Sequence, residues 1–179
     1  METKSSLRQS MRALRAKIDP STREHAAKEV LQQLEVWPDF LQAEKIGVYY
    51  PREYELNIKP LMENCWQRGK LLFLPVYKNK NISFHKFTDK TRLVKSSYGI
   101  YEPDTSEPEE LNLDLVLVPS IAVDANNYRI GYGAGAYDRV LCRQHISIKK
   151  IVYVAYKCNF VTTCFPEDHD IAADKLLIG

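Results

Sequence analysis

Two uninterrupted apolar runs, Leu115–Val118 and Ile151–Ala155, constrain the fold of this chain of 179 residues more than any other feature. A strand whose residues do not alternate between apolar and polar is covered on both faces. Such strands belong to parallel sheets, because crossover helices cover both faces of the sheet. Lys45–Tyr50, Leu71–Tyr77 and Lys175–Ile178 are further β-prone runs. We therefore expect a mostly parallel sheet.

Helical segments separate these runs. An apolar stripe at steps of three and four predicts a first helix, and it consists of Leu7, Met11, Leu14 and Ile18. Four basic residues follow the same period along the flank of that helix: Lys4, Arg8, Arg12 and Arg15. Ser21 with Glu24 predicts a capping box that opens a second helix. Residues 56–68 have helical spacing and end before Gly69.

The alternation of strands and helices predicts a layered α/β fold. Residues 82–87 alternate apolar and polar, so we expect the stretch 82–103 to add an antiparallel edge. Residues 103–110 form an acidic, proline-rich stretch that predicts a surface loop. With no internal repeat or linker, residues 1–179 are expected to form one domain.

Composition excludes several classes of protein. The net charge of +2 carries no basic surplus, and basic residues are not interleaved with aromatic ones, so nucleic-acid binding is disfavoured. No apolar run is long enough to span a bilayer, and the N-terminus lacks the apolar region of a secretory signal. The four cysteines form no C-x-x-C pair and are expected to be reduced thiols. We expect a cytoplasmic monomer that acts on small molecules.

A glycine-rich segment follows the apolar strand at 115–118. Gly131, Gly133 and Gly135 alternate with other residues, and a helix-compatible segment, 134–143, opens within them. Unpaired N–H groups at a helix start attract phosphate, and Arg129 adds a positive charge beside them. The segment lacks the Gly-Lys-Ser/Thr of a Walker loop, and Ala136 stands where a dinucleotide motif has its third glycine. A phosphate-binding loop is favoured over a plain strand–helix turn, which remains an alternative.

The segment Arg129–Arg139, with the sequence RIGYGAGAYDR, resembles the motif R-L-G-x-G-G-G-Y-Y-D-R of the 5-formyltetrahydrofolate cyclo-ligase family. Other pieces resemble motifs of that family in the same order along nearly the whole chain: Lys4–Arg8, Tyr50–Glu55, Gly99–Pro103, Asp114–Asp124 and His169–Asp174. The resemblance implies a three-layer α/β/α sandwich with a mostly parallel, Rossmann-like sheet. It also implies ATP- and Mg²⁺-dependent conversion of 5-formyltetrahydrofolate to 5,10-methenyltetrahydrofolate, ADP and phosphate.

The resemblance further implies roles for individual residues. ATP would be bound by Lys4, Arg8, Arg129, Ile130, Gly131, Tyr132, Gly133, Ala134, Gly135, Ala136 and Tyr137. The folate would be bound by Tyr50, Glu55, Tyr132 and Ala136. Mg²⁺ would be bound by Asp138 and Asp170, since it takes oxygen ligands. The residues with a direct part in catalysis would be Tyr137, Arg129 and Lys4.

Each role has a plainer alternative. Lys4 and Arg8 could lie on a solvated helix flank, and Glu55 could be a surface carboxylate like Glu53. Asp170 could be an ordinary loop acid. His169 and Trp66 are interpreted as structural residues, with Trp66 in the core.

Three positions depart from the family pattern. Ala134 replaces a glycine and Tyr128 replaces a turn glycine, and we expect the backbone to tolerate both. Ala136 replaces an aromatic residue whose loss could remove about 1–3 kcal/mol of folate contact. This departure motivates the alternative of a catalytically weakened paralogue that still binds nucleotide or folate. A sugar-phosphate isomerase on a similar scaffold is a further alternative, which would not depend on ATP.

Overall fold

The computed structural model describes residues 2–104, 108–142 and 146–179. Six strands form the central sheet: β1 (Lys45–Gly47), β2 (Leu71–Lys78), β3 (Asn81–Phe87), β6 (Asn112–Pro119), β9 (Ser147–Ala155) and β11 (Lys175–Ile178). Their order is β11-β9-β6-β1-β2-β3, and every neighbouring pair is parallel except β2 with β3. The mostly parallel sheet is therefore confirmed. Of the antiparallel edge expected at 82–103, only the part within Asn81–Phe87 joins this sheet, because residues 93–103 pair with each other in a separate two-stranded sheet.

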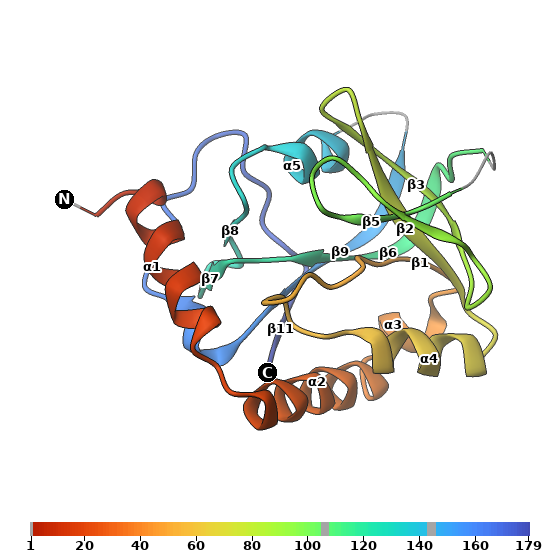
Figure 1. Ribbon diagram of the computed structural model, residues 1–179, viewed down its shortest axis with the longest axis horizontal. Coiled ribbons are helices and arrows are strands. Elements are labelled where there is room, and N and C mark those ends of the chain that lie inside the picture. The colour runs from red at the N-terminus through yellow and green to blue at the C-terminus, as the bar shows by residue number, and fades with distance from the viewer. Residues whose placement is uncertain (1, 105–107, 143–145) are drawn as a thin grey trace.

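Helices cover the two faces of this sheet (Figure 1). On one face lie α2 (Pro20–Glu35), α3 (Pro38–Gln42) and α4 (Lys59–Gln67), and on the other lies the short α5 (Ala136–Leu141). Leu34, Phe40 and Leu61 pack into one buried cluster, whereas Val140 packs into a second cluster beyond the sheet. The middle strands β6 and β9 contribute to both clusters, which is why their sequences do not alternate. The α/β fold with three layers is confirmed.

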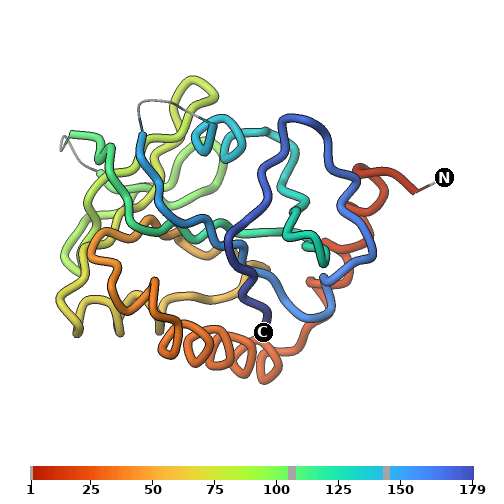
Figure 2. The backbone as a smooth tube through the Cα atoms, turned by 180° about the vertical axis from the view of Figure 1, so that it is seen from behind, coloured from red at the N-terminus to blue at the C-terminus, as the bar shows by residue number. Residues whose placement is uncertain are grey.

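The remaining elements lie outside the central sheet and the helices that cover it. They are α1 (Lys4–Ala16), the hairpin of β4 (Leu93–Lys95) and β5 (Tyr101–Pro103), the small sheet of β7 (Ala122–Asp124), β8 (Arg129–Ile130) and β10 (Phe160–Val161), and the short 3-10 helix η1 (Lys157–Asn159). Seen from behind, α1 lies beside the segment after β9 (Figure 2). The side chain of Asn159 donates to the carbonyl of Met11 over 3.2 Å and ties these two segments together.

Several predicted boundaries were wrong for local reasons. The second helix is capped by Asp19, not by the predicted Ser21–Glu24 box. The Asp19 carboxylate accepts from Thr22 N–H at 3.0 Å, and Pro20 occupies the first turn. The helix predicted at 56–68 begins only at Lys59, whose N–H donates to Asn57 Oδ1 over 3.1 Å. Leu14 in the predicted apolar stripe is 39% exposed.

Two further segments are shorter than expected. The first strand ends at Gly47 rather than reaching Tyr50, and the chain then turns so that Tyr49 Oη donates to Leu56 O over 2.8 Å. The helix expected at 134–143 begins at Ala136, because Gly135 has a positive φ of 62° that an α-helix does not accept. Residue 143 and part of the expected loop 103–110 lie outside the described residues.

Candidate active site

The site lies where the sheet changes direction. The chain runs outward from β1 to β2 on one side and from β6 to β9 on the other, so the carboxyl ends of β1 and β6 border a topological switch point. Open α/β sheets bind ligands at such points. A cavity of about 410 Å³ lies there, lined by Tyr49 and Tyr50 after β1 and by Pro119 at the end of β6. We call it the active-site pocket.

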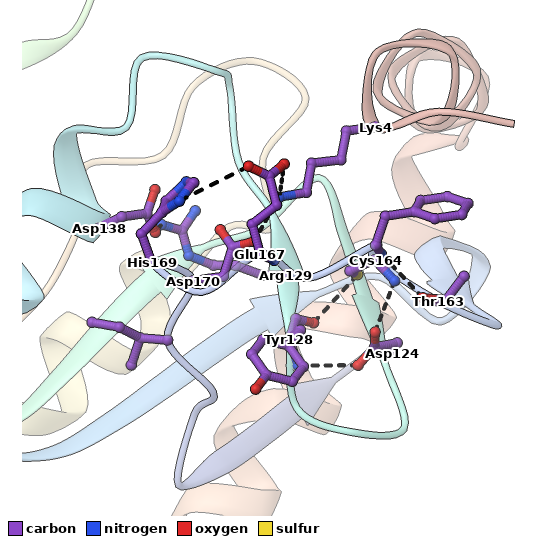
Figure 3. Close-up of polar contacts among 12 residues, drawn as sticks. Lys4, Asp124, Tyr128, Arg129, Asp138, Thr163, Cys164, Glu167, His169 and Asp170 are labelled. Atoms are coloured by element: carbon purple, nitrogen blue, oxygen red, sulfur yellow. Dashed lines mark hydrogen bonds and ion pairs between the residues drawn. The ribbon is translucent and has the colours of Figure 1, made fainter.

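Two basic residues of α1 line this pocket (Figure 3 shows Lys4). Lys4 Nζ lies 2.6 Å from Asp170 Oδ2 and 2.9 Å from Glu167 Oε1. Although burial by itself lowers it, the hydrogen bonds with these carboxylates raise the pKa of Lys4 overall. Arg8 Nε donates to the carbonyl of Gly131 over 2.8 Å. Neither side chain lies on a plain solvated flank, because Arg8 reaches the glycine-rich loop and Lys4 reaches the carboxylates of Glu167 and Asp170.

The glycine-rich loop needs its glycines for two different reasons. Gly133 and Gly135 have positive φ angles of 95° and 62°, which favour glycine. Gly131 has no such angle, but a Cβ there would lie 2.4 Å from Arg129 Nη1. Ala134 and Tyr128 are absent from the described residues with positive φ, which confirms that the backbone tolerates both departures. Asn127 adopts the left-handed conformation in that turn instead, with φ 63°.

Arg129 is the buried cation of the pocket. Its side chain is 6% exposed, and Nη2 contacts Asp138 Oδ1 on α5 at 2.5 Å. The guanidinium also lies over the rings of Tyr137 and Tyr153, at 5.8 and 5.2 Å from their centroids. These contacts fix the guanidinium against the loop. The positive charge of Arg129 therefore has a fixed position beside the glycine-rich loop.

Glu55 and a group of tyrosines form the other half of the pocket. Glu55 is only 6% exposed, unlike Glu53, and Oε2 accepts from the N–H of Arg52 at 2.9 Å. Burial and, to a smaller extent, the charge of Glu55 raise the pKa of Tyr132 to about 12. Burial and Glu55 likewise raise the pKa of Tyr137. Both phenols therefore stay protonated at neutral pH and can donate a hydrogen bond.

The sequence analysis missed two residues that line the active-site pocket, Arg52 and Glu102, and the burial of Arg15 beside Tyr132. Arg15 was expected on the helix flank, but it is 3% exposed and donates through Nη2 to Tyr132 Oη over 2.8 Å. Arg52 and Glu102 also line the pocket. Burial raises the pKa of Glu102, whose Oε1 accepts from Tyr77 N–H at 3.2 Å. Its place in the Gly99–Pro103 motif was the one available signal.

Trp66 lies in the core, as predicted. Trp66 packs against the core beside Phe87, with ring centroids 5.3 Å apart. His169, interpreted as a structural residue, is 69% exposed and lines the active-site pocket. Asp174 accepts from the N–H of Ile151 at 2.8 Å, which is a structural contact. The four cysteines are unpaired thiols.

Asp138 and Asp170 are the two pocket carboxylates that were predicted to bind a metal ion. Figure 3 shows both near Arg129, where Asp138 contacts Arg129 and Asp170 contacts Lys4. Within the ranges that the structure describes, no cluster of three or more His, Cys, Asp or Glu side chains could hold a metal ion. Mg²⁺ commonly uses one or two carboxylates and completes its shell with phosphate oxygens and water. The carboxylates of Asp138 and Asp170 therefore fit a Mg²⁺ ion whose other ligands are water and the oxygens of a phosphorylated ligand.

The fold and the pocket together define the class: an α/β enzyme that acts on small molecules at the carboxyl edge of its sheet. None of the helices in the described part of the chain is long and apolar enough to cross a membrane.

Comparisons with known proteins identify the family. The family model of the 5-formyltetrahydrofolate cyclo-ligases matches residues 1–179. A 5-formyltetrahydrofolate cyclo-ligase of Escherichia coli K12 is 29% identical over 168 residues, covering 90% of this chain and 92% of the relative. The NMR structure of Aquifex aeolicus 5,10-methenyltetrahydrofolate synthetase superposes with a TM-score of 0.84 at 28% identity, over 98% of this chain and 89% of that one. The fold is shared with a Mycoplasma pneumoniae protein at a TM-score of 0.74 and 17% identity, over 98% of each chain.

The chain belongs to the 5-formyltetrahydrofolate cyclo-ligase family, and it is a ligase of folate metabolism.

Proposed function

We propose that this enzyme converts 5-formyltetrahydrofolate to 5,10-methenyltetrahydrofolate with consumption of ATP in the presence of Mg²⁺. One observation carries the proposal. Lys4 and Arg8 from the first helix and Arg129 from the glycine-rich loop line the same pocket as the buried carboxylate Glu55. Three cations suit a triphosphate, and the tyrosine-lined part beside Glu55 suits a flat heterocycle with N–H groups.

The chemistry asks the protein to align two substrates. The formyl oxygen attacks the γ-phosphorus and ADP leaves, which converts the oxygen into a good leaving group. N10 then bonds to the formyl carbon and loses its proton, and the C–O bond breaks to release phosphate. No covalent link to the protein is needed, so catalysis consists of positioning and of neutralising charge.

Each pocket residue has a proposed part in this alignment. Lys4, Arg8 and Arg129 neutralise charge on the phosphates, and loop N–H groups add hydrogen bonds. Tyr137, protonated because its pKa is raised by burial, donates a hydrogen bond where the two substrates meet. Glu55 accepts from folate N–H groups while Tyr50 lines the folate side. Asp138 and Asp170 would hold Mg²⁺, which supplies charge stabilisation for the transferring phosphoryl group.

The test is absorbance of the methenyl product after mixing enzyme, 5-formyltetrahydrofolate, ATP and Mg²⁺. We expect product growth that stops when ATP is omitted or when EDTA removes the metal. A substrate with heavy oxygen in its formyl group should transfer the label into the released phosphate. Unlabelled phosphate would refute phosphorylation of the formyl oxygen.

Ala136 is the observation that favours the second candidate, a weakened paralogue. The residue lines the pocket without an aromatic ring, and it packs instead against the cluster around Val140. Calorimetry with ATP, combined with the product assay, separates the two candidates. A weakened paralogue would bind ATP normally and yield no methenyl product, whereas turnover without ATP would point to neither.

A further inference from the structure

One turn of the chain contacts both ends of the segment that carries Asp170. The structure describes residues 164–173 throughout, and they form no helix or strand, so no regular ladder of hydrogen bonds holds them. The turn runs from Asp124, the last residue of β7, to Tyr128, and it leads directly into Arg129 of the active-site pocket. We call residues 124–128 the clamp turn and residues 164–173 the Asp170 segment.

Asp124 binds the start of the Asp170 segment (Figure 3). Asp124 is fully buried, and its Oδ2 accepts from the N–H of Cys164 at 2.8 Å. Oδ1 accepts from the N–H groups of Asn126 and Tyr128, both at 3.0 Å. Burial and the charge of Asp124 raise the pKa of the Cys164 thiol to about 12, so this thiol stays protonated and donates to Tyr128 O over 3.4 Å. One buried carboxylate therefore joins two segments that lie 40 positions apart.

Asn127 binds the other end of the Asp170 segment. Its carbonyl accepts from the N–H of Ala173 at 2.9 Å, and its side-chain Nδ2 donates to Ala173 O over 3.1 Å. The φ of 63° at Asn127 is one that glycine adopts freely and that asparagine tolerates. A glycine could keep this backbone and the first of the two bonds, but it would lack the second. Between the two ends, Tyr153 Oη donates to Ile171 O over 2.5 Å.

We propose that Asp124 and Asn127 are positioning residues, which hold Asp170 where it and Asp138 can bind one Mg²⁺ ion. This inference rests on the proposed function. The clamp turn leads into Arg129, which contacts Asp138, so a single turn is attached to the supports of both proposed metal ligands. Without the clamp, the Asp170 segment would also occupy other positions in the ligand-free enzyme. The apparent affinity for the metal would then fall in proportion to the fraction of molecules that have Asp170 in place.

Two variants of Asn127 in the full chain test the proposal. Asn127→Gly keeps the conformation of the turn, and Asn127→Asp keeps a side chain of the same size, but neither can donate to Ala173 O. Each should raise the Mg²⁺ midpoint at saturating ATP about five-fold, the effect of one lost hydrogen bond. The rate at saturating Mg²⁺ should return to that of the wild type, and the KM for 5-formyltetrahydrofolate should not change. A wild-type midpoint in Asn127→Asp would overturn the role of the side-chain donor.

Asn79→Gly is the matched control. Asn79 lies in the turn between β2 and β3 with a φ of 52°, is exposed, and does not line the active-site pocket, so the same change there should leave the Mg²⁺ midpoint unaltered. Asp124→Asn should raise the midpoint more than the Asn127 variants do, because an amide N–H would face the N–H of Cys164. The Asn127 variants keep the test decisive if Asp124→Asn does not fold.

Amide hydrogen exchange of the ligand-free enzyme gives a readout that needs neither metal nor turnover. Peptides from residues 164–173 should exchange faster in both Asn127 variants, whereas peptides from β9 should exchange as in the wild type. Calorimetry with Mg²⁺ and a non-hydrolysable ATP analogue should show binding about five-fold weaker in the same variants. A wild type that binds no Mg²⁺ with the analogue would refute the proposed function. If the wild type binds them, unchanged affinity or unchanged exchange in the Asn127 variants overturns the positioning role.

Discussion

Lys4 and Asp170 lie 166 positions apart in the sequence, yet Lys4 Nζ contacts Asp170 Oδ2 at 2.6 Å. The contact joins α1 to the segment before β11 and places a helix cation beside a proposed metal ligand. Lys4→Ala should raise the KM for ATP about ten-fold, because a charged contact with phosphate is lost. Initial rates at varied ATP measure this KM, with Lys17→Ala, at the C-terminal cap of the same helix, as the control. An unchanged KM would contradict the proposed role of α1.

Asp138→Asn should lower kcat at least about a hundred-fold, because the proposed Mg²⁺ ligand and the partner of Arg129 are both affected. Titration with Mg²⁺ at saturating ATP distinguishes these effects. Loss of a metal ligand shifts the Mg²⁺ midpoint upward, whereas mere displacement of Arg129 lowers the rate at an unchanged midpoint. Full activity in Asp138→Asn would exclude both roles.

Gly131→Ala should displace the Arg129 guanidinium, since the added Cβ would lie 2.4 Å from Nη1. We expect the KM for ATP to rise about ten-fold. Gly69→Ala is the matched control. Gly69 has a positive φ of 74° and no atom within 4 Å of an added Cβ, so its change should lower stability by about 1 kcal/mol without altering the KM. An equal KM for ATP in Gly131→Ala and Gly69→Ala would refute the displacement of Arg129 as the cause.

Ala136→Tyr should restore the aromatic residue found in the family pattern. Ala136 begins α5 and lines the active-site pocket. A ring there would add contact area worth roughly 1–2 kcal/mol, so the KM for the folate should fall about five- to ten-fold while the KM for ATP stays constant. A higher folate KM would mean that another side chain already fills this space.

Asp114→Asn should lower stability at neutral pH by about 2 kcal/mol, because the carboxylate accepts three charge-assisted hydrogen bonds. Although burial by itself raises it, the Lys149 side chain and the N–H groups of Lys45 and Glu44 lower the pKa of Asp114 from 3.8 to about 2. The ionised carboxylate therefore stabilises the fold above about pH 4, and this contribution disappears as the pH falls towards 2. Urea unfolding of the wild type and of Asp114→Asn across this pH range should show that the difference in their free energies of unfolding shrinks as the pH falls. A constant difference would refute the role of the ionised carboxylate.

The strands and layers were predictable because burial on both faces leaves a local signature. Leu115–Val118 and Ile151–Ala155 lack alternation, and both lie in the middle of the sheet. Helix starts were less predictable, since Asp19 and Ser21 are both good caps and only the backbone geometry decides between them.

The site was predictable where one segment carried it, as in Arg129–Asp138. It was not predictable where partners come from distant segments. Helical periodicity placed Arg15 on a flank, but its burial depends on Ser120 and Tyr132, which lie more than 100 residues away. Glu102 likewise becomes a pocket residue only because β5 packs near β2, where Tyr77 N–H reaches its carboxylate.

The paired charges around the glycine-rich loop have a consequence for discrimination among solutes. Lys4 with Asp170 and Arg129 with Asp138 neutralise each other as described. An inorganic anion alone would break both ion pairs and leave the two carboxylates without a partner. A divalent cation alone would leave Lys4 and Arg129 without a partner. Only a ligand that carries both positive and negative charge gives each of the four side chains a new partner. We therefore expect this half of the pocket to select against simple inorganic ions.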